Sequence, residues 1–128
     1  MNLHVAIGVD VVEVARLHTA LGRTPSLAQR IFTEAELAAA RGRVASLAGR
    51  FAAKEATMKA LGVGLGAVPL RAIEVATEPS GAPRLVLASE ADTLARARGW
   101  RQVSLSIAHE RSVAVAMVVA MCERPGEP

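Results

Sequence analysis

The 128-residue chain contains few aromatic residues, one cysteine and no tyrosine. Aromatic side chains make up 2% of the sequence, which nearly excludes a single-stranded nucleic-acid platform built from stacked rings. The lone thiol, Cys122, cannot form an internal disulfide, and no pair of thiols has the spacing of a zinc site. A reducing compartment is therefore expected. Because a core without large rings buries little surface, we also expect additional burial between subunits.

Long apolar runs are also missing. The longest run late in the chain, residues 113–122, has about half the length that a membrane-spanning helix requires. The N-terminal apolar stretch is interrupted by His4 and Asp10 and lacks a basic leader, so it does not have the pattern of a signal peptide. These features predict a cytoplasmic protein with no membrane partner.

The basic residues are not concentrated in one part of the chain. Lysine and arginine total 15 against 12 acidic residues, for a net charge of +3. The arginines are spread from Arg16 to Arg124, without the dense stripe that binding of a phosphate backbone needs. We therefore expect no nucleic-acid partner, while attraction to an acidic protein partner stays open.

Apolar residues form 52% of the sequence and charged residues 21%, proportions typical of a folded chain rather than a disordered one. The length suits one domain with one core. We assign residues 1–122 to this domain and expect a flexible C-terminal tail over residues 123–128.

The periodicity of the sequence predicts an α+β fold, with an antiparallel sheet packed on a long helix. Alternation that starts at Leu3 indicates a strand ending near Asp10. Thr33 and Glu36 have the spacing of a capping box, which predicts the start of a helix. The strongest helix signal ends at Gly62, a typical C-terminal stop. The remaining predictions are helices over 11–21, 44–61 and 89–98, a hairpin of strands 73–77 and 84–87, and a hairpin of strands 103–108 and 112–121.

Asp10 interrupts an apolar segment, residues 5–12, in which a carboxylate is not expected. Burying it as an ion costs several kcal/mol unless it is paired or bound to a metal. The alternative is an N-cap for the following helix, since Asp10 lies just before the helical pattern.

Glu55 falls near the middle of the apolar stripe of the long helix. The only lysines of the chain, Lys54 and Lys59, lie at opposite margins of this stripe. A surface pair between Glu55 and Lys59 explains their spacing but not the apolar surroundings of the carboxylate. The stripe itself consists of Val44, Leu47, Ala48, Phe51, Met58 and Gly62.

Two carboxylates on apolar surfaces, with lysines near one of them, indicate magnesium and phosphate chemistry. Mg²⁺ binds one or two protein carboxylates and fills its other positions with waters and substrate phosphate oxygens. A lysine then neutralises phosphate charge that the metal leaves uncovered. Asp10 and Glu55 are 45 residues apart, so this hypothesis requires the fold to bring them together.

Two further features each allow two interpretations. Residues 62–66 contain three glycines, and they either wrap a phosphate or form a helix C-cap followed by a turn. They are not a dinucleotide fingerprint, because they follow a helix rather than open one. His109 lies at the tip of the last predicted hairpin and is either a turn residue or a ligand.

Three segments carry a family resemblance when they are taken together. They are residues 7–14 (IGVDVVEV), residues 50–56 (RFAAKEA) continuing to 59–62 (KALG), and residues 103–109 (VSLSIAH). In this order they resemble the holo-[acyl-carrier-protein] synthases, the small stand-alone type of 4'-phosphopantetheinyl transferase. The middle segment is the most specific, and the likeness extends to about Met121.

The resemblance implies a homotrimer with active sites at subunit interfaces, Mg²⁺ as the metal, coenzyme A as the donor and an apo acyl carrier protein as the acceptor. Asp10 and Glu55 match the metal-binding carboxylates of the family, and Lys59 matches its phosphate-contacting lysine; these three are the expected catalytic residues. Arg16 matches a basic position that contacts the acidic carrier. The residues expected near the coenzyme are Arg50, Lys54, Lys59, Gly62, Gly64 and His109.

Three positions depart from the family pattern. Ala108 stands where a serine or threonine usually precedes the histidine, and Met58 stands where a small hydroxyl residue is common. Both changes remove potential hydrogen bonds to the coenzyme. Ser26 replaces a further basic residue that often meets the carrier, which predicts a changed or weaker carrier preference.

The reaction implied is attack of the carrier's serine hydroxyl on the β-phosphate of coenzyme A, which releases adenosine 3',5'-bisphosphate and supports fatty acid biosynthesis. The base that takes the serine proton stays open among Glu55, Asp10 and a metal-bound water. The alternative functions are a non-catalytic basic module that binds RNA or an acidic protein, a transferase for polyketide or peptide synthetase carriers, and a structural trimer without activity.

Overall fold

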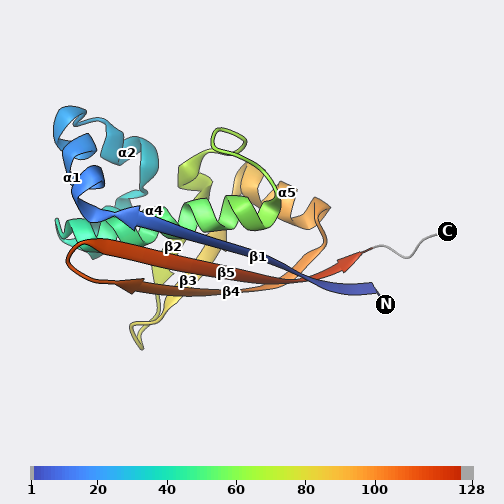
Figure 1. The fold of residues 1–128 in the computed structure, drawn as a ribbon. Helices are drawn as coiled ribbons and strands as arrows, with labels where there is room; N and C mark the ends of the chain where they lie inside the picture. The colour runs from blue at the N-terminus through green and yellow to red at the C-terminus, as the bar shows by residue number, and fades with distance from the viewer. Residues whose placement is uncertain (1, 125–128) are drawn as a thin grey trace.

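The computed structural model describes residues 2–124, and its central feature is one long helix lying across a three-stranded antiparallel sheet (Figure 1). The helix is α4 (Val44–Leu61). The sheet has the strand order β1-β5-β4. Its strands are β1 (Asn2–Glu13), β4 (Trp100–His109) and β5 (Val113–Arg124). The predicted α+β class, with an antiparallel sheet packed on the long helix, is confirmed.

The smaller elements surround α4 (Figure 1). Figure 1 shows α1 and α2 near one end of this helix and α5 near the other, with the two-stranded hairpin of β2 and β3 beside it. These elements are α1 (Val14–Arg23), α2 (Leu27–Ile31), α3 (Glu34–Ala40), the short 3-10 helix η1 (Leu70–Ala72), β2 (Ile73–Thr77), β3 (Pro83–Leu87) and α5 (Ser89–Ala97). No helix within residues 2–124 is long and apolar enough to cross a membrane.

Small residues let α4 approach the sheet closely. A Cβ atom at Gly8 of β1 would lie 1.9 Å from the carbonyl oxygen of Ala56, so only glycine fits at this crossing. Alanines fill much of the interface and are fully buried: Ala52, Ala53 and Ala56 on α4, and Ala114, Ala116 and Ala120 on β5. The high alanine content of the sequence is therefore explained by short side chains between helix and sheet.

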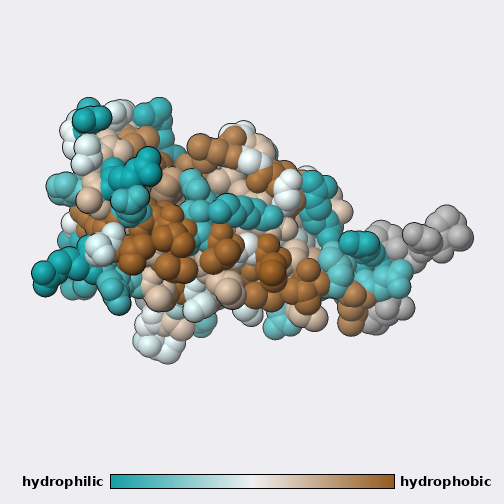
Figure 2. Space-filling model, viewed as in Figure 1, coloured by the Kyte–Doolittle hydropathy of each residue, from teal (hydrophilic) through white to brown (hydrophobic). Residues whose placement is uncertain are grey.

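The other face of the sheet is apolar and exposed. Alternation along β1 sends one set of side chains toward α4 and the other set away from it. Figure 2 shows a hydrophobic band along this part of the surface. A contiguous exposed apolar surface of this kind marks an interaction site in soluble proteins. Its most exposed members are Leu3, Val5, Ile7, Val9, Val11, Met117 and Met121.

Several local predictions are confirmed. The long helix covers residues 44–61, and Gly62 ends it with a φ of +77°. Thr33 and Glu36 form the capping box at the start of α3, with both of the reciprocal hydrogen bonds present. The two antiparallel hairpins also form, as β2 with β3 and β4 with β5.

The prediction that the first strand ends near Asp10 is wrong. Pairing with β5 continues to Glu13, which lies opposite Val113, so α1 begins at Val14 rather than at residue 11. Valines at this junction have branched Cβ atoms that suit a strand, and the partner strand is long enough to pair with them. Asp10 consequently lies inside β1 opposite Ala116, and the interpretation of Asp10 as a helix N-cap is wrong.

Two other boundaries also differ from the predictions. The sequence after Gly22 contains a short helix, α2, that periodicity did not indicate because it has only five residues. At the C-terminus, β5 continues through Glu123 and Arg124, which belong to the sheet rather than to a loose tail. The rest of the predicted tail, residues 125–128, lies outside the described residues.

Candidate active site

The fold brings Asp10 and Glu55 to one cavity, as the magnesium hypothesis requires. Asp10 lies on the face of β1 that is turned toward α4, and Glu55 lies on α4 itself. Both line a cavity of about 590 Å³ between β1 and helices α1, α2 and α4. The close contact at Gly8, two residues before Asp10, holds the strand and the helix near enough for this arrangement.

Lys59 pairs with Asp10. Its ammonium nitrogen lies 2.9 Å from Asp10 Oδ1 and also donates to the backbone carbonyl of Val9 at 3.1 Å. The lysine side chain is 56% exposed, whereas that of Asp10 is 13% exposed. The simple surface pair between Glu55 and Lys59 is therefore not what the described residues form, because the carboxylate partner of Lys59 belongs to another element.

The surroundings of Glu55 raise its pKa. Burial raises the pKa of Glu55 above its ordinary value, and the neighbouring Asp10 carboxylate raises it further, while Lys59 acts in the opposite direction. The hydrogen bond from Lys59 to Asp10 raises the pKa of that lysine. One ammonium group is thus shared by two acids, and the site has an excess of negative charge that a cation would relieve.

The donor set fits a magnesium ion. Within residues 2–124 there is no group of three or more histidine, cysteine or acidic side chains placed to enclose a metal. Two carboxylate donors are instead what Mg²⁺ takes when waters and phosphate oxygens supply the rest of its coordination. The excess negative charge around Asp10 and Glu55 is consistent with that role.

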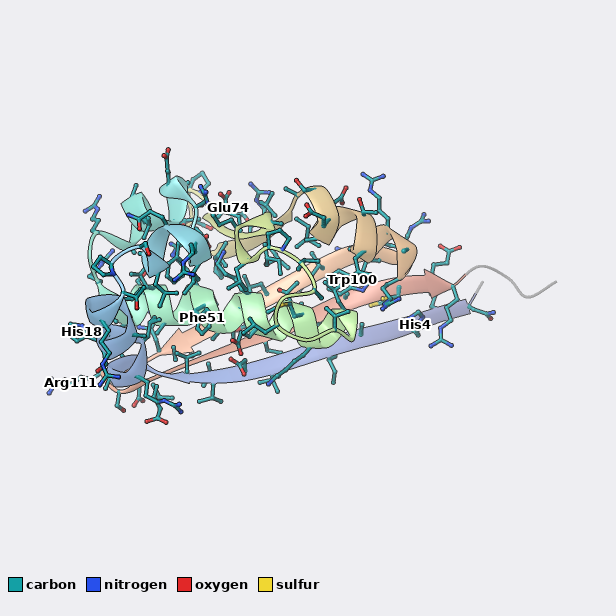
Figure 3. The ribbon with its side chains drawn as sticks, turned by 90° about the horizontal axis from the view of Figure 1, so that it is seen from above. His4, His18, Phe51, Glu74, Trp100 and Arg111 are labelled. Carbon is teal, nitrogen blue, oxygen red and sulfur yellow. The ribbon has the colours of Figure 1, made fainter. Side chains whose placement is uncertain are left out.

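Apolar side chains form most of the remaining cavity wall. Leu17 and Leu27 reach it from α1 and α2, and Phe51 reaches it from α4. Figure 3 shows Phe51 on α4, near the end of the molecule where α1 lies. Arg16 lines the same cavity, and its side chain is largely exposed. An exposed cation on α1 is therefore next to the cavity that contains the acidic pair.

Arg50 and His109 meet at a second, smaller cavity of about 190 Å³. The Arg50 guanidinium donates to the Val75 carbonyl at 2.6 Å and to the Thr77 hydroxyl at 3.2 Å. Its buried Nε atom has no hydrogen-bond partner among the described residues. A guanidinium beside an imidazole suits an anion such as phosphate. His109 is the last residue of β4, so its interpretation as a turn residue is wrong.

Gly49 allows α4 and β4 to lie close together beside Arg50 and His109. A Cβ atom at position 49 would be 2.8 Å from the Ile107 side chain and 3.8 Å from His109 Cδ2. Position 49 therefore keeps α4 and β4 in near contact, next to Arg50. Burial lowers the pKa of Arg50, and the negative charges of Glu36 and Glu74 oppose this change.

Lys54 does not face either cavity. Its side chain is fully buried and lies 2.7 Å from the equally buried Glu36 carboxylate. Its ammonium also donates to the backbone carbonyls of Leu70 and Ile73. Burial lowers the pKa of Lys54, and Glu36 counteracts this shift. All three ammonium donors are used inside the chain, so this placement does not support the prediction that Lys54 contacts the coenzyme.

The glycine-rich segment after α4 begins as a helix cap. Gly62 donates its N–H to the carbonyl of Lys59 at 3.0 Å, which is the predicted C-cap. Gly64 follows in the loop, with open space where a side chain would lie. Leu65 of the same loop lines the cavity of Asp10 and Glu55. The loop is therefore adjacent to the acidic pair, and a phosphate contact of Gly62 and Gly64 stays a prediction.

Sequence reasoning missed the partners of the two buried cations. Glu36 was recognisable only as a capping residue, and no spacing rule connects it with Lys54, 18 residues later. The same holds for Thr77, which accepts from Arg50 across 27 positions. A charged residue within an alanine-rich helix is the only signal that the sequence offered. Met58, which stands where the family commonly has a small hydroxyl residue, is a core residue with 3% exposure.

The comparisons with known proteins agree with this geometry. Residues 6–118 match the model of the family described as the 4'-phosphopantetheinyl transferase superfamily. A holo-[acyl-carrier-protein] synthase of Moorella thermoacetica is 45% identical over 115 residues, which is 88% of this chain and 90% of that protein. One from Salinispora arenicola is 45% identical over 91% of this chain and 97% of its own length.

Solved structures lead to the same family. The Helicobacter pylori holo-[acyl-carrier-protein] synthase in complex with coenzyme A superposes with a TM-score of 0.80 at 32% identity, covering 89% of this chain and 98% of that one. The Chronobacterium ammoniagenes enzyme in complex with coenzyme A gives a TM-score of 0.86 at 30% identity, covering 94% and 99%.

The fold and these matches together define a phosphopantetheine-transferring enzyme. The chain belongs to the 4'-phosphopantetheinyl transferase superfamily, and within it to the family of holo-[acyl-carrier-protein] synthases. The family resemblance predicted from the three sequence segments is confirmed.

Proposed function

We propose that this enzyme transfers the 4'-phosphopantetheine group of coenzyme A to a serine of an apo acyl carrier protein in a magnesium-dependent reaction. The serine hydroxyl gives its proton to a base, for which Glu55 and Asp10 are the candidate side chains. The serine oxygen forms a bond to the β-phosphorus, the bond from that phosphorus to the bridging oxygen breaks, and adenosine 3',5'-bisphosphate leaves. The observation that carries the proposal is that Asp10 and Glu55 line one cavity, while the ammonium of Lys59 lies 2.9 Å from Asp10.

Asp10 and Glu55 are the residues that would hold the metal. When bound, Mg²⁺ supplies positive charge that stabilises the phosphate oxygens during transfer. The raised pKa of Glu55 supports this assignment, because a carboxylate held beside a second carboxylate gains from a nearby cation. Lys59 is exposed enough to reach a ligand while it remains close to Asp10.

The chain's other polar residues bind and orient the coenzyme in this proposal. The ammonium group of Lys59 neutralises part of the diphosphate charge. Arg50 and His109 hold the nucleotide portion at the second cavity, where the buried guanidinium is fixed by Val75 and Thr77. Lys54 is left out of the contact set because its ammonium group is buried and fully used.

The carrier protein would dock beside α1. Arg16 is exposed on this helix and lines the cavity of the acidic pair, so an acidic partner held there would be close to the proposed reaction centre. The neighbouring α2 begins after Ser26, which lacks the positive charge common in the family. Contact with Arg16 is then the main electrostatic anchor of the carrier in this proposal. We assign the carrier of fatty acid biosynthesis as the acceptor because the chain belongs to the holo-[acyl-carrier-protein] synthases.

The enzyme assembles as a homotrimer in this proposal, and we place it in the cytoplasm. The exposed apolar row on β1 and β5 supports assembly, because Ile7 is 67% exposed and Val5 and Val9 on the same face of β1 are 53% and 49% exposed. Sedimentation equilibrium at micromolar concentration tests the assembly. A mass of three chains is expected, and a monomer at all concentrations would contradict it.

Mass spectrometry of a carrier protein tests the reaction directly. Apo carrier is incubated with coenzyme A and the enzyme, with Mg²⁺ or with a chelator. A gain of one phosphopantetheine group on the serine, together with free adenosine 3',5'-bisphosphate, is expected only with the metal. Carrier that gains no mass in either condition would overturn the proposal. Carriers from polyketide and peptide synthetases in parallel reactions identify the preferred acceptor.

A further inference from the structure

The outer edge of β2 is bonded by side chains instead of by another strand. β2 pairs with β3 on one side only. On its other side, Glu36 accepts from the N–H of Val75, Arg50 donates to the carbonyl of Val75, and Lys54 donates to the carbonyl of Ile73. Charged side chains from α3 and α4 thus supply the hydrogen bonds that a neighbouring strand would make.

Glu36 and Lys54 form the centre of this arrangement. Both side chains have no exposed surface, and they lie 2.7 Å apart. Glu36 Oε1 also accepts from the backbone N–H of Thr33 at 3.0 Å, and Lys54 donates to the carbonyl of Leu70 at 3.0 Å. The pair therefore connects the start of α3, α4, η1 and β2 through direct hydrogen bonds.

Val75 links this pair to Arg50. Its N–H is held by Glu36 Oε2 at 3.0 Å, and its carbonyl is held by the Arg50 guanidinium at 2.6 Å. The same guanidinium donates to Thr77, two residues further along β2. Any shift of β2 along α4 would therefore move the acceptors that orient Arg50.

We propose that Glu36 and Lys54 are positioning residues that fix β2 against α4 and thereby hold the Arg50 guanidinium in its binding orientation at the cavity shared with His109. This inference rests on the proposed function, in which Arg50 contacts the nucleotide portion of the coenzyme. Arg50 lines this cavity, and its buried Nε atom has no hydrogen-bond partner among the residues described. A guanidinium held by two fixed acceptors loses less conformational freedom when an anion binds.

The presence of a buried ion pair, Glu36 with Lys54, is better explained by the positioning of β2 than by a gain in folding stability. A buried ion pair contributes little net stability compared with apolar side chains of the same volume. Its hydrogen bonds, however, have fixed directions, and they define which residues of β2 lie opposite Glu36 and Lys54. An apolar contact between α4 and the edge of β2 would leave the Ile73 and Val75 peptide groups without partners.

The test needs a variant that removes both charges together. Changing Glu36 or Lys54 alone leaves one buried charge without its partner, and such a protein unfolds readily. The double variant Glu36→Gln/Lys54→Met removes both charges and approximately conserves the volume of both side chains. Leu94→Ala on α5 is the control, because it removes packing from the core at a site outside this network.

Binding of adenosine 3',5'-bisphosphate is measured by calorimetry, below the unfolding temperature of every variant. We expect the dissociation constant of the double variant to rise about tenfold, whereas that of Leu94→Ala stays at the native value. Arg50→Ala should weaken binding by about tenfold in the native protein but by less than about threefold in the double variant, because Arg50 there has already lost its orientation.

Two results would overturn the positioning role. One is a folded double variant that binds the nucleotide with native affinity; the other is an equal effect of Arg50→Ala in both proteins. If Arg50→Ala has no effect in the native protein, the assignment of Arg50 fails and the positioning inference fails with it. In that case the native protein would still catalyse magnesium-dependent transfer. A native protein that catalyses no such transfer would instead overturn the proposed function.

Discussion

Two lysines of α4 each pair with a carboxylate of another element, and the two pairs differ in how completely they are enclosed. Lys54 and Glu36 lie 2.7 Å apart with no exposed surface on either side chain. Lys59 and Asp10 lie 2.9 Å apart, but the lysine is 56% exposed and the aspartate 13%. The distances are nearly equal, so the strength of the direct contact does not distinguish the pairs. Their surroundings do.

In the enclosed pair the polar groups have their hydrogen bonds filled within the chain, whereas the open pair carries unbalanced charge. Glu36 accepts from Lys54 and from two backbone N–H groups, and the ammonium of Lys54 uses all of its donors inside the chain. Asp10 shares Lys59 with a second carboxylate, Glu55, whose pKa is raised by burial and by this neighbour. The filled hydrogen bonds make the first pair a structural link, while the unbalanced charge of the second suits the cation and phosphate of the proposed function.

The comparison is tested most strongly by removing the lysine from each pair. Lys54→Met leaves the buried Glu36 carboxylate without its ammonium partner, and we expect a loss of about 3–5 kcal/mol in the free energy of unfolding. Lys59→Met affects an exposed group and should change stability only slightly. Urea denaturation followed by circular dichroism measures both. Similar losses in the two variants would show that enclosure does not separate the pairs.

Glu55→Gln tests the open pair by its activity. The amide keeps the shape of the side chain but loses the charge, so magnesium-dependent transfer should fall by about a hundredfold to a thousandfold. The folded state should be retained, because one of two neighbouring negative charges is removed. Transfer to the carrier is measured by mass spectrometry, with the exposed Glu110→Gln as the matched control. Native activity in Glu55→Gln would remove this residue from the site.

Arg16→Ala tests whether the region beside the open pair contacts the carrier. Arg16 is exposed and lies away from the reacting atoms, so its loss should raise the KM for the carrier by about three- to tenfold with little change in kcat. Arg111→Ala, on the turn between β4 and β5, removes another exposed arginine as a control. Steady-state kinetics measure both. An equal loss with a short serine peptide as acceptor would contradict contact with the carrier.

The smallest expected effect is the pH dependence of stability at Glu55. Its pKa is raised in the folded protein, so the folded state binds a proton there more tightly than the unfolded chain. Stability therefore falls as the pH rises from the ordinary glutamate pKa through the raised value. In metal-free buffer, the difference in unfolding free energy between Glu55→Gln and the native protein should grow across this window. A difference independent of pH would contradict the raised pKa.

The sequence was sufficient for elements with strong local signals. The helix over residues 44–61, its cap at Gly62 and the capping box of Thr33 were predictable because propensity and capping act within a few residues. The boundary after β1 was not, because pairing with Val113 at the far end of the chain extends the strand to Glu13. The predicted flexible tail over residues 123–128 was wrong at its start for the same reason, since β1 also pairs with Arg124.

The candidate site was predictable in part because two acids stood out against apolar surroundings. Asp10 and Glu55 attracted notice by interrupting apolar patterns, and Lys59 as one of the only two lysines. His109 was already a candidate ligand, and the family motif added Arg50. The burial of Lys54 away from the cavity that Glu55 lines could not be predicted. Adjacent side chains on a helix point about 100° apart, and only the packing of the core determines which of the two is enclosed.

The sequence by itself determined the α+β class, the long helix, and the presence of two acids and two lysines in apolar surroundings, because these depend on local patterns. Tertiary structure alone decided which lysine joins which acid. Lys54 meets Glu36 across 18 residues, where α4 packs against α3 and β2. Lys59 meets Asp10 across 49 residues, where α4 packs closely on β1 at Gly8. Contacts at such separations arise from packing of the whole chain, which no local spacing rule encodes.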